Sequence, residues 1–216
     1  MRRYSLVLVL MSLVYGGIFG YNLSDYPYKS PYDSIFQEMS DVMVISNALY
    51  DKDTDIVFSA LRRAGELKIV DVKQRVLSII GEAGPIANQG KVRQATEYKR
   101  VFDMGVLVVG KIGSTNEASI IVAYLPEQKN ALSQLCILQA LRELPKSKAV
   151  IEHLTKFSQT VDNSTDARVA KALVDAFVSS GEKSVINTLI GLKYQVPQAI
   201  RYYIDEAVRK MQKGSN

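Results

Sequence analysis

The 216-residue chain has no tryptophan, one histidine (His153) and one cysteine (Cys136). A single cysteine excludes a disulfide scaffold, and one histidine beside one cysteine leaves the familiar zinc sites short of ligands. A large excess of charge of one sign is also missing, since 27 Lys and Arg residues against 22 Asp and Glu residues give a net charge of only +5. That balance lies far below the charge density of a dedicated nucleic-acid-binding protein. We therefore expect no metal, no cofactor and no nucleic-acid partner.

The chain begins with the pattern of an exported protein. A basic start, Met1 to Arg3, precedes 17 uncharged residues from Tyr4 to Gly20 that end among glycines. This pattern predicts a signal peptide over residues 1–20, cleaved after Gly20. An uncleaved N-terminal anchor is the alternative, because 17 residues lie at the short edge of a membrane span. The protein is accordingly expected in the periplasm or secreted, or else anchored in a membrane and facing away from the cytoplasm.

Residues 21–32 differ from both of their neighbours in composition. They contain four tyrosines together with Pro27 and Pro31. Because proline fixes its own φ and restricts the preceding residue, the segment is predicted to be an extended, non-helical arm. We expect this arm to pack on the first helix rather than to serve as a sticky recognition strip.

From residue 33 onward the sequence has helical periodicity and an internal repeat. Apolar residues recur at three- and four-residue spacing, and the alternation typical of strands is not sustained. Small residues recur at intervals of 32 to 45 residues, at Ala60, Gly105, Ala140, Ala172 and Ala207. An aliphatic residue follows each of them directly, and an apolar residue precedes each by three positions. A short side chain is what a close approach of two helices requires, so the repeat predicts helices stacked in a series.

Residues 49–67 resemble the first helix of a HEAT-like repeat, and residues 166–177 followed by residues 184–192 resemble another complete repeat. This resemblance implies an all-α fold, an α-solenoid of stacked antiparallel helix pairs. It would span residues 33–216 with about four units and a capping helix near 198–211. A globular helical bundle without regular stacking is the competing fold. The longest repeat interval contains three glycines and a proline within residues 81–90, which predicts a loop between units.

Candidate catalytic motifs fail on their details. Residues 105–112 approach a phosphate-binding loop, but Ile112 stands where the motif needs Ser or Thr. His153 has no nucleophile or acid arranged around it in the sequence, and Cys136 has the apolar neighbours of a buried hydrophobe. Asp53 and Asp55 are interpreted as helix caps. We predict no catalytic residue and therefore a protein that is not an enzyme.

Residues 62–100 are the most basic part of the chain, with nine basic and four acidic side chains. Arg62 falls opposite the apolar stripe of its helix, so it is predicted to point to solvent. The residues proposed to bind a partner with an anionic surface are Arg62, Arg63, Arg75, Lys91 and Arg93. The alternative is a solvated face that only keeps the protein soluble.

These features together favour an exported, non-enzymatic scaffold that presents a helical-repeat surface to a protein partner. One alternative is an enzyme, because HEAT-like folds also occur in DNA glycosylases and bilin lyases. A second alternative is an envelope-structural protein, whose contact with the membrane would run only through an uncleaved leader. The sequence leaves the partner and the oligomeric state open.

Overall fold

The computed structural model describes residues 23–89 and 92–213, and within them it contains helices and no strand. The all-α prediction is therefore confirmed for this part of the chain. The predicted leader, residues 1–20, and the proposed binding residue Lys91 lie outside the described residues. None of the helices in the described ranges combines the length and the hydrophobicity that crossing a membrane requires.

Eleven α-helices follow one another along the described chain. Their bounds are α2 (Asp33–Glu38), α3 (Val42–Ala48), α4 (Thr54–Glu66), α5 (Lys73–Gln89), α6 (Val92–Ile112), α7 (Thr115–Ala123), α8 (Ala131–Glu143), α9 (Lys148–Ser158), α10 (Ala167–Val178), α11 (Ile186–Lys193) and α12 (Gln198–Lys213). A short 3-10 helix, η1 (Leu23–Asp25), comes before them.

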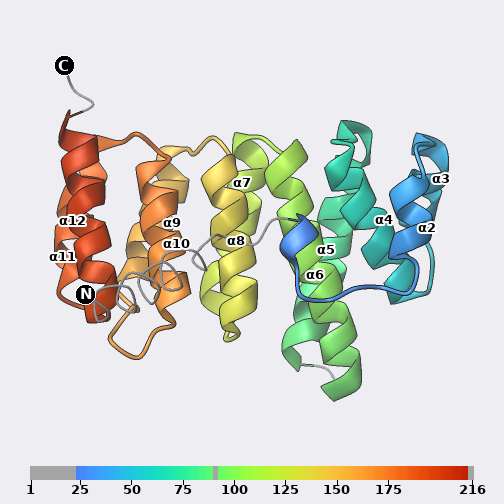
Figure 1. Cartoon of the computed structure of the whole chain (residues 1–216), viewed down its shortest axis with the longest axis horizontal. Helices are drawn as coiled ribbons and strands as arrows, with labels where there is room; N and C mark the ends of the chain where they lie inside the picture. Colours follow the sequence, from blue (N-terminus) through green and yellow to red (C-terminus); the bar gives the residue numbers. More distant parts are fainter. Residues whose placement is uncertain (1–22, 90–91, 214–216) are drawn as a thin grey trace, which may run out of the picture.

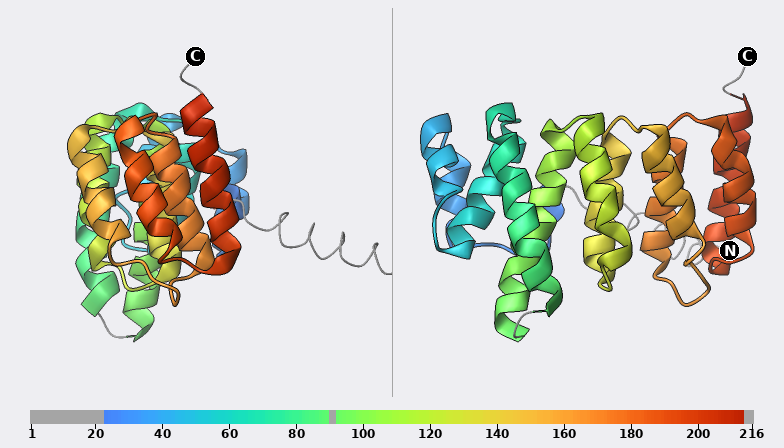
Figure 2. Two further views of the ribbon diagram at one scale, coloured as in Figure 1. Left: turned by 90° about the vertical axis from the view of Figure 1, so that its left-hand side faces the viewer. Right: turned by 180° about the vertical axis from the view of Figure 1, so that it is seen from behind.

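The helices form an elongated body two layers thick, shown in Figure 1 and from behind in Figure 2. In one layer α4 packs on α6, α6 on α8, α8 on α10, and α10 on α12. In the other layer α7 packs on α9, and α9 on α11, while α5 lies along α6. Helices α2 and α3 form one end of the body, and α11 and α12 form the other.

Local capping explains where several helices begin. Asp53 is the N-cap of α4, and its carboxylate accepts a hydrogen bond of 2.8 Å from the backbone N–H of Asp55. Ser114 and Glu117 form a capping box at the start of α7. These side chains satisfy backbone N–H groups that the first turn of a helix leaves free. The capping role predicted for Asp53 is confirmed, whereas the same prediction for Asp55 was wrong, because Asp55 lies within the first turn of α4.

The small residues of the repeat all lie buried in even-numbered helices, from Ala60 in α4 to Ala207 in α12. Glycine permits the closest of these helix contacts. A Cβ atom on Gly105 would lie 2.9 Å from Cγ1 of Ile80, and one on Gly110 would lie 2.8 Å from the Cα of Ala140. Such distances leave no room for a larger side chain. Short side chains therefore lie where α6 approaches α5 and α8 most closely, as the repeat predicted.

The loop predicted over residues 81–90 was wrong for residues 81–89, which belong to α5. Pro85 lies inside this helix with its side chain exposed. Gly84 precedes it and has no Cβ to clash with the proline ring. Gly84 is also buried, and a Cβ there would lie 3.4 Å from the ring of Phe102 in α6. Packing of α5 against α6 thus outweighs the weak helix propensity of glycine and proline.

Candidate interaction surface

Arg62 does not point to solvent, so that prediction was wrong. Its side chain is only 8% exposed and forms an ion pair with Asp33 at the start of α2. The guanidinium also donates a 2.8 Å hydrogen bond to the carbonyl of Tyr28 and lies 4.9 Å from the ring centre of Phe58. The N-terminal arm and α2 cover the side of α4 that the apolar stripe leaves free. Arg62 therefore holds this chain segment in place.

Two more of the predicted binding residues are tied to their own chain. Arg63 donates to the carbonyl of Met39 at 2.7 Å and forms an ion pair with Glu66. Arg75 donates to a backbone carbonyl in the same way, that of Leu49 at 3.1 Å. It also pairs with Glu82 and lies 4.6 Å from the ring centre of Tyr50.

Arg93 has a different environment from the other predicted residues. Its side chain is 93% exposed, and its ion pair with Glu97 spans one helical turn of α6. The structure therefore does not gather the described members of the predicted set into one open patch. Their proposed role in binding stays a prediction.

A buried carboxyl group anchors the arm to α6. Asp103 is fully buried and accepts hydrogen bonds from the hydroxyl of Tyr26 and from Nζ of Lys99, both at 2.9 Å. Burial raises the pKa of the Asp103 carboxyl, while Lys99, Ser133 and Tyr26 each oppose that rise. Burial likewise raises the pKa of the Tyr26 hydroxyl. The Asp103 carboxyl thus binds both the phenol of Tyr26 and the ammonium group of Lys99, and these contacts hold the arm against α6.

The rest of the arm follows α4 and α6. Tyr28 donates a 2.7 Å hydrogen bond to Asp55, and the guanidinium of Arg100 lies 3.8 Å from the centre of its ring. The ring of Tyr26 packs on Phe58 with centroids 5.6 Å apart. As predicted, the arm lacks helix from Tyr26 to Pro31, although Leu23 to Asp25 form a 3-10 turn. It packs on two central helices rather than only on the first helix after it.

The residues with catalytic potential occupy structural environments. His153 is exposed on α9, and Cys136 is fully buried in α8, where burial holds the pKa of its thiol well above the ordinary value. The chain from Gly105 to Ile112 is helical, and all but Lys111 of these residues are buried, so the core-packing interpretation is confirmed. Across the described ranges no group of three or more potential ligands is positioned to hold a metal ion.

One lysine has a perturbed pKa. Partial burial lowers the pKa of Lys146 to about 8, against a smaller raising effect of Glu143. Its Nζ donates to the carbonyl of Leu144 at 3.0 Å and to the hydroxyl of Ser179 at 2.9 Å. These contacts join the C-terminal ends of α8 and α10, so the lysine has a structural task.

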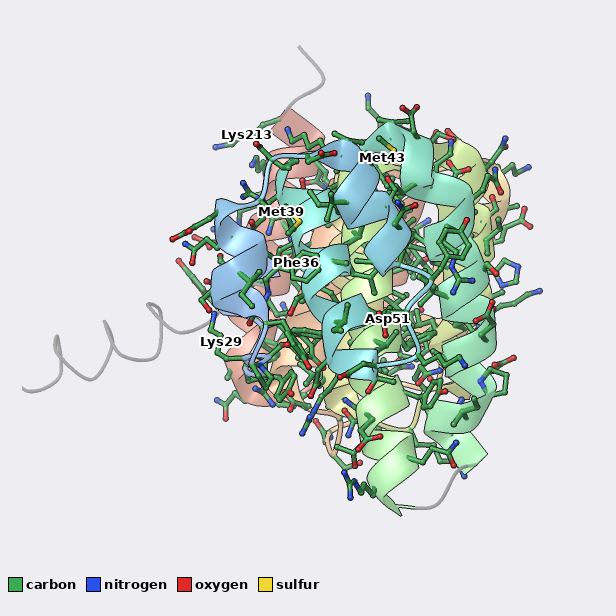
Figure 3. All side chains as sticks on the ribbon, turned by 90° about the vertical axis from the view of Figure 1, so that its right-hand side faces the viewer. Lys29, Phe36, Met39, Met43, Asp51 and Lys213 are labelled. Carbon is green, nitrogen blue, oxygen red and sulfur yellow. The ribbon has the colours of Figure 1, made fainter. Side chains whose placement is uncertain are left out.

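Exposed apolar side chains gather at one end of the molecule. Five of the eleven large hydrophobic side chains that are exposed in the described chain fall within residues 35–50. We define the end face as four of them, Ile35, Val42, Met43 and Val44. Figure 3 looks onto this end and labels Met39 and Met43 on the elements nearest the viewer.

Two of the four residues of the end face, Met43 and Val44, point away from the body. Ile45 and Leu49 are the buried residues of this segment, and α3 packs on α4. At 100° per residue, Met43 and Val44 lie on the far side of α3 from Ile45 and Leu49. Three acidic residues at the same end of the body, Glu38, Asp41 and Asp51, are exposed as well.

The sequence analysis did not identify this surface. A run of four apolar residues, Val42 to Ile45, follows the N-cap Asp41, and only the last of the four is buried. Such a run predicts burial when it is considered alone. The signal that could have revealed it is a helix at the end of the repeat series with apolar residues on both of its sides.

Comparison of the chain with protein-family models, with curated proteins and with solved structures gives no match.

Proposed function

We propose that the protein is an exported, non-enzymatic interaction scaffold that binds a protein partner through its end face. The two layers of helices and the buried small residues support a HEAT-like solenoid as its architecture. In such a stack each unit covers its neighbour, and the terminal units normally carry a polar outer surface.

The observation that carries this proposal is the exposed apolar end face itself. Apolar patches rimmed by polar residues mark interaction sites on folded proteins. Here Ile35, Val42, Met43 and Val44 are between 44% and 69% exposed. The buried ion pair of Arg62 and the bond from the half-buried Arg75 to its own backbone leave the predicted basic stretch less suited to the same task.

Export rests on the composition of residues 1–20, which has the basic start and apolar stretch of a signal peptide. N-terminal sequencing of the protein from its host tests this part of the proposal. We expect the mature chain to begin at Tyr21. An intact leader on protein from the cytosol would overturn it.

Binding is tested with a matched pair of variants. Val44 and Ile120 are both 44% exposed, but Val44 lies on the end face and Ile120 on α7. We expect Val44→Glu to abolish capture of partner proteins from the envelope fraction and Ile120→Glu to leave it intact. Glu at position 44 lies in the first turn of α3, where the helix dipole favours a negative charge, so the fold should persist.

Circular dichroism of both variants should show the helical content of the parent protein. A third variant, Arg93→Glu, tests the most exposed of the described basic residues first predicted to bind. Equal capture by the parent and Val44→Glu would overturn the end face as the binding surface. If only Arg93→Glu abolishes capture, the binding site lies in the basic stretch, residues 62–100, and not on the end face.

A further inference from the structure

We infer that the partner of the end face is a second copy of this chain, which docks head to tail through α11 and α12. This inference rests on the proposed role of the end face as a binding surface. It follows from the charges and the shape of the two ends of the body.

The two ends carry opposite charge. Residues 33–51, which form the α2–α3 end, contain four acidic side chains and no basic one. Asp33 is paired with Arg62, which leaves Glu38, Asp41 and Asp51 exposed at this end. Residues 186–213, which form the other end, contain five basic and two acidic side chains.

The outer side of α12 presents two of these basic groups together with an aromatic ring. Figure 2 (left) looks onto this end of the body. Ile200 and Ile204 are buried against the body, so residues on the opposite side of the helix face outward. Tyr202, Arg209 and Lys213 lie there together with one exposed acidic residue, Glu206, and Tyr202 is 58% exposed. An aromatic ring followed by cations along one helix suits an apolar surface that has exposed carboxylates beside it.

The same charges exclude the symmetric arrangement. Two end faces docked on each other would bring the exposed acidic residues of both copies together, and like charges across an interface are repulsive. Contact between unlike ends is heterologous, so each added copy leaves both kinds of end free again. The expected product is an open series of oligomers, not a closed dimer.

Two variants that each block one end test this inference. Met43→Gln with Val44→Gln removes the apolar contacts of the end face, and Arg209→Glu with Lys213→Glu reverses the charge of α12. The full chain of the parent should show a mass that rises with concentration in sedimentation analysis. Each blocked variant alone should associate at least about ten-fold more weakly than the parent.

Mixing the two variants gives the decisive result. One retains an intact end face and the other an intact α12, so they should form a 1:1 dimer that does not grow further. Association between the parent copies should weaken as salt is added, because exposed charges are screened. Both variants share the same N-terminus, so association through residues 1–22 would be unaffected by either block.

Three outcomes would overturn the inference: a monomeric parent, dimers of the α12 variant alone, or no association in the mixture. If the parent is monomeric while Val44→Glu still abolishes capture of envelope proteins, the end face binds a different protein and only the self-association fails. If Val44→Glu changes neither association nor capture, the proposed function fails as well.

Discussion

At the α2–α3 end, a buried ion pair between distant segments holds the chain, whereas at the α12 end the ion pair between α11 and α12 is exposed. A partly buried hydrogen bond from Tyr203 to Asp175 joins α12 to α10. Arg62 and Asp33 are 29 positions apart, and their side chains are 8% and 19% exposed. Lys193 and Asp205 pair at 2.7 Å across α11 and α12, with side chains 33% and 37% exposed. The two ion pairs are therefore expected to contribute different amounts to the free energy of unfolding, because water screens the exposed Lys193–Asp205 pair more strongly than the buried Arg62–Asp33 pair.

The difference extends to the outer surfaces. At the α2–α3 end, Arg62 binds Tyr28 of the arm and Asp33 of α2 and so holds both segments in place. The same end exposes apolar side chains. The α12 end exposes charged side chains outward and packs Ile200 and Ile204 inward. Stable attachment and an open apolar surface can thus coexist at one end because buried polar contacts supply the attachment.

The largest expected effect is on the buried pair. Arg62→Met leaves the Asp33 carboxylate without its cation in a mostly buried site, which should cost about 3 kcal/mol in the free energy of unfolding. Urea denaturation measures this loss. Arg93→Met, which alters an exposed pair, should change stability by less than about 0.5 kcal/mol.

A double variant sharpens the result. Adding Asp33→Asn to Arg62→Met removes the uncompensated charge and should recover part of the lost stability. If Arg62→Met alone proves as harmless as Arg93→Met, the distinction between the two ends has no energetic basis.

A smaller loss is expected where the arm meets α6. Tyr26→Phe removes one hydroxyl that donates to the buried Asp103 carboxyl, which should cost about 1.5 kcal/mol. Tyr28→Phe is the matched control in the same arm, since its hydroxyl meets Asp55 in a partly exposed site. Denaturation curves should place the loss for Tyr28→Phe below about 1 kcal/mol. Equal losses would show that burial of the arm contact is unimportant.

This contact also predicts a dependence on pH. Because burial raises the Asp103 pKa above 3.8, the native state keeps the proton to a higher pH than the unfolded chain does. The carboxyl therefore stabilises the fold most at acid pH, and this contribution falls as pH rises through the native pKa. The Tyr26 hydroxyl lowers that pKa, so Tyr26→Phe should lose more stability near pH 7 than near pH 4. A loss that grows toward acid pH would contradict this assignment.

The smallest effect is expected at the α12 end. Lys193→Ala breaks an exposed pair with Asp205 and should cost less than about 0.5 kcal/mol. That small loss should shrink further in high salt, which screens exposed charges. Thermal unfolding at low and high salt measures it. A loss of stability as large as that of Arg62→Met would show that the ion pairs at the two ends contribute equally to stability.

Prediction from sequence succeeded where the information is local. The helical character of residues 33–89 and 92–213, the cap at Asp53, the burial of Cys136 and the core position of residues 105–112 were each found in the structure. Each depends on a pattern contained within one helix or its flanks. The loop over residues 81–89 was a local prediction that failed, because packing of α5 on α6 overrides the preferences of Gly84 and Pro85.

The environment of Arg62 shows why the candidate site was harder to predict. Helical periodicity correctly placed Arg62 away from the apolar stripe of α4, but it carries no information on which segment covers the other side. That side is covered by Tyr28 and Asp33, and Tyr26 reaches Asp103 across 77 positions of sequence.

The sequence by itself determined the helices, their apolar sides and the small residues that let them approach, since these follow from spacing along a single element. Only the tertiary structure decided which arginines are buried, where the arm lies and which apolar side chains stay uncovered. The reason is physical: exposure depends on the packing of distant segments, and α3 has apolar residues on both sides but a neighbour, α4, on only one.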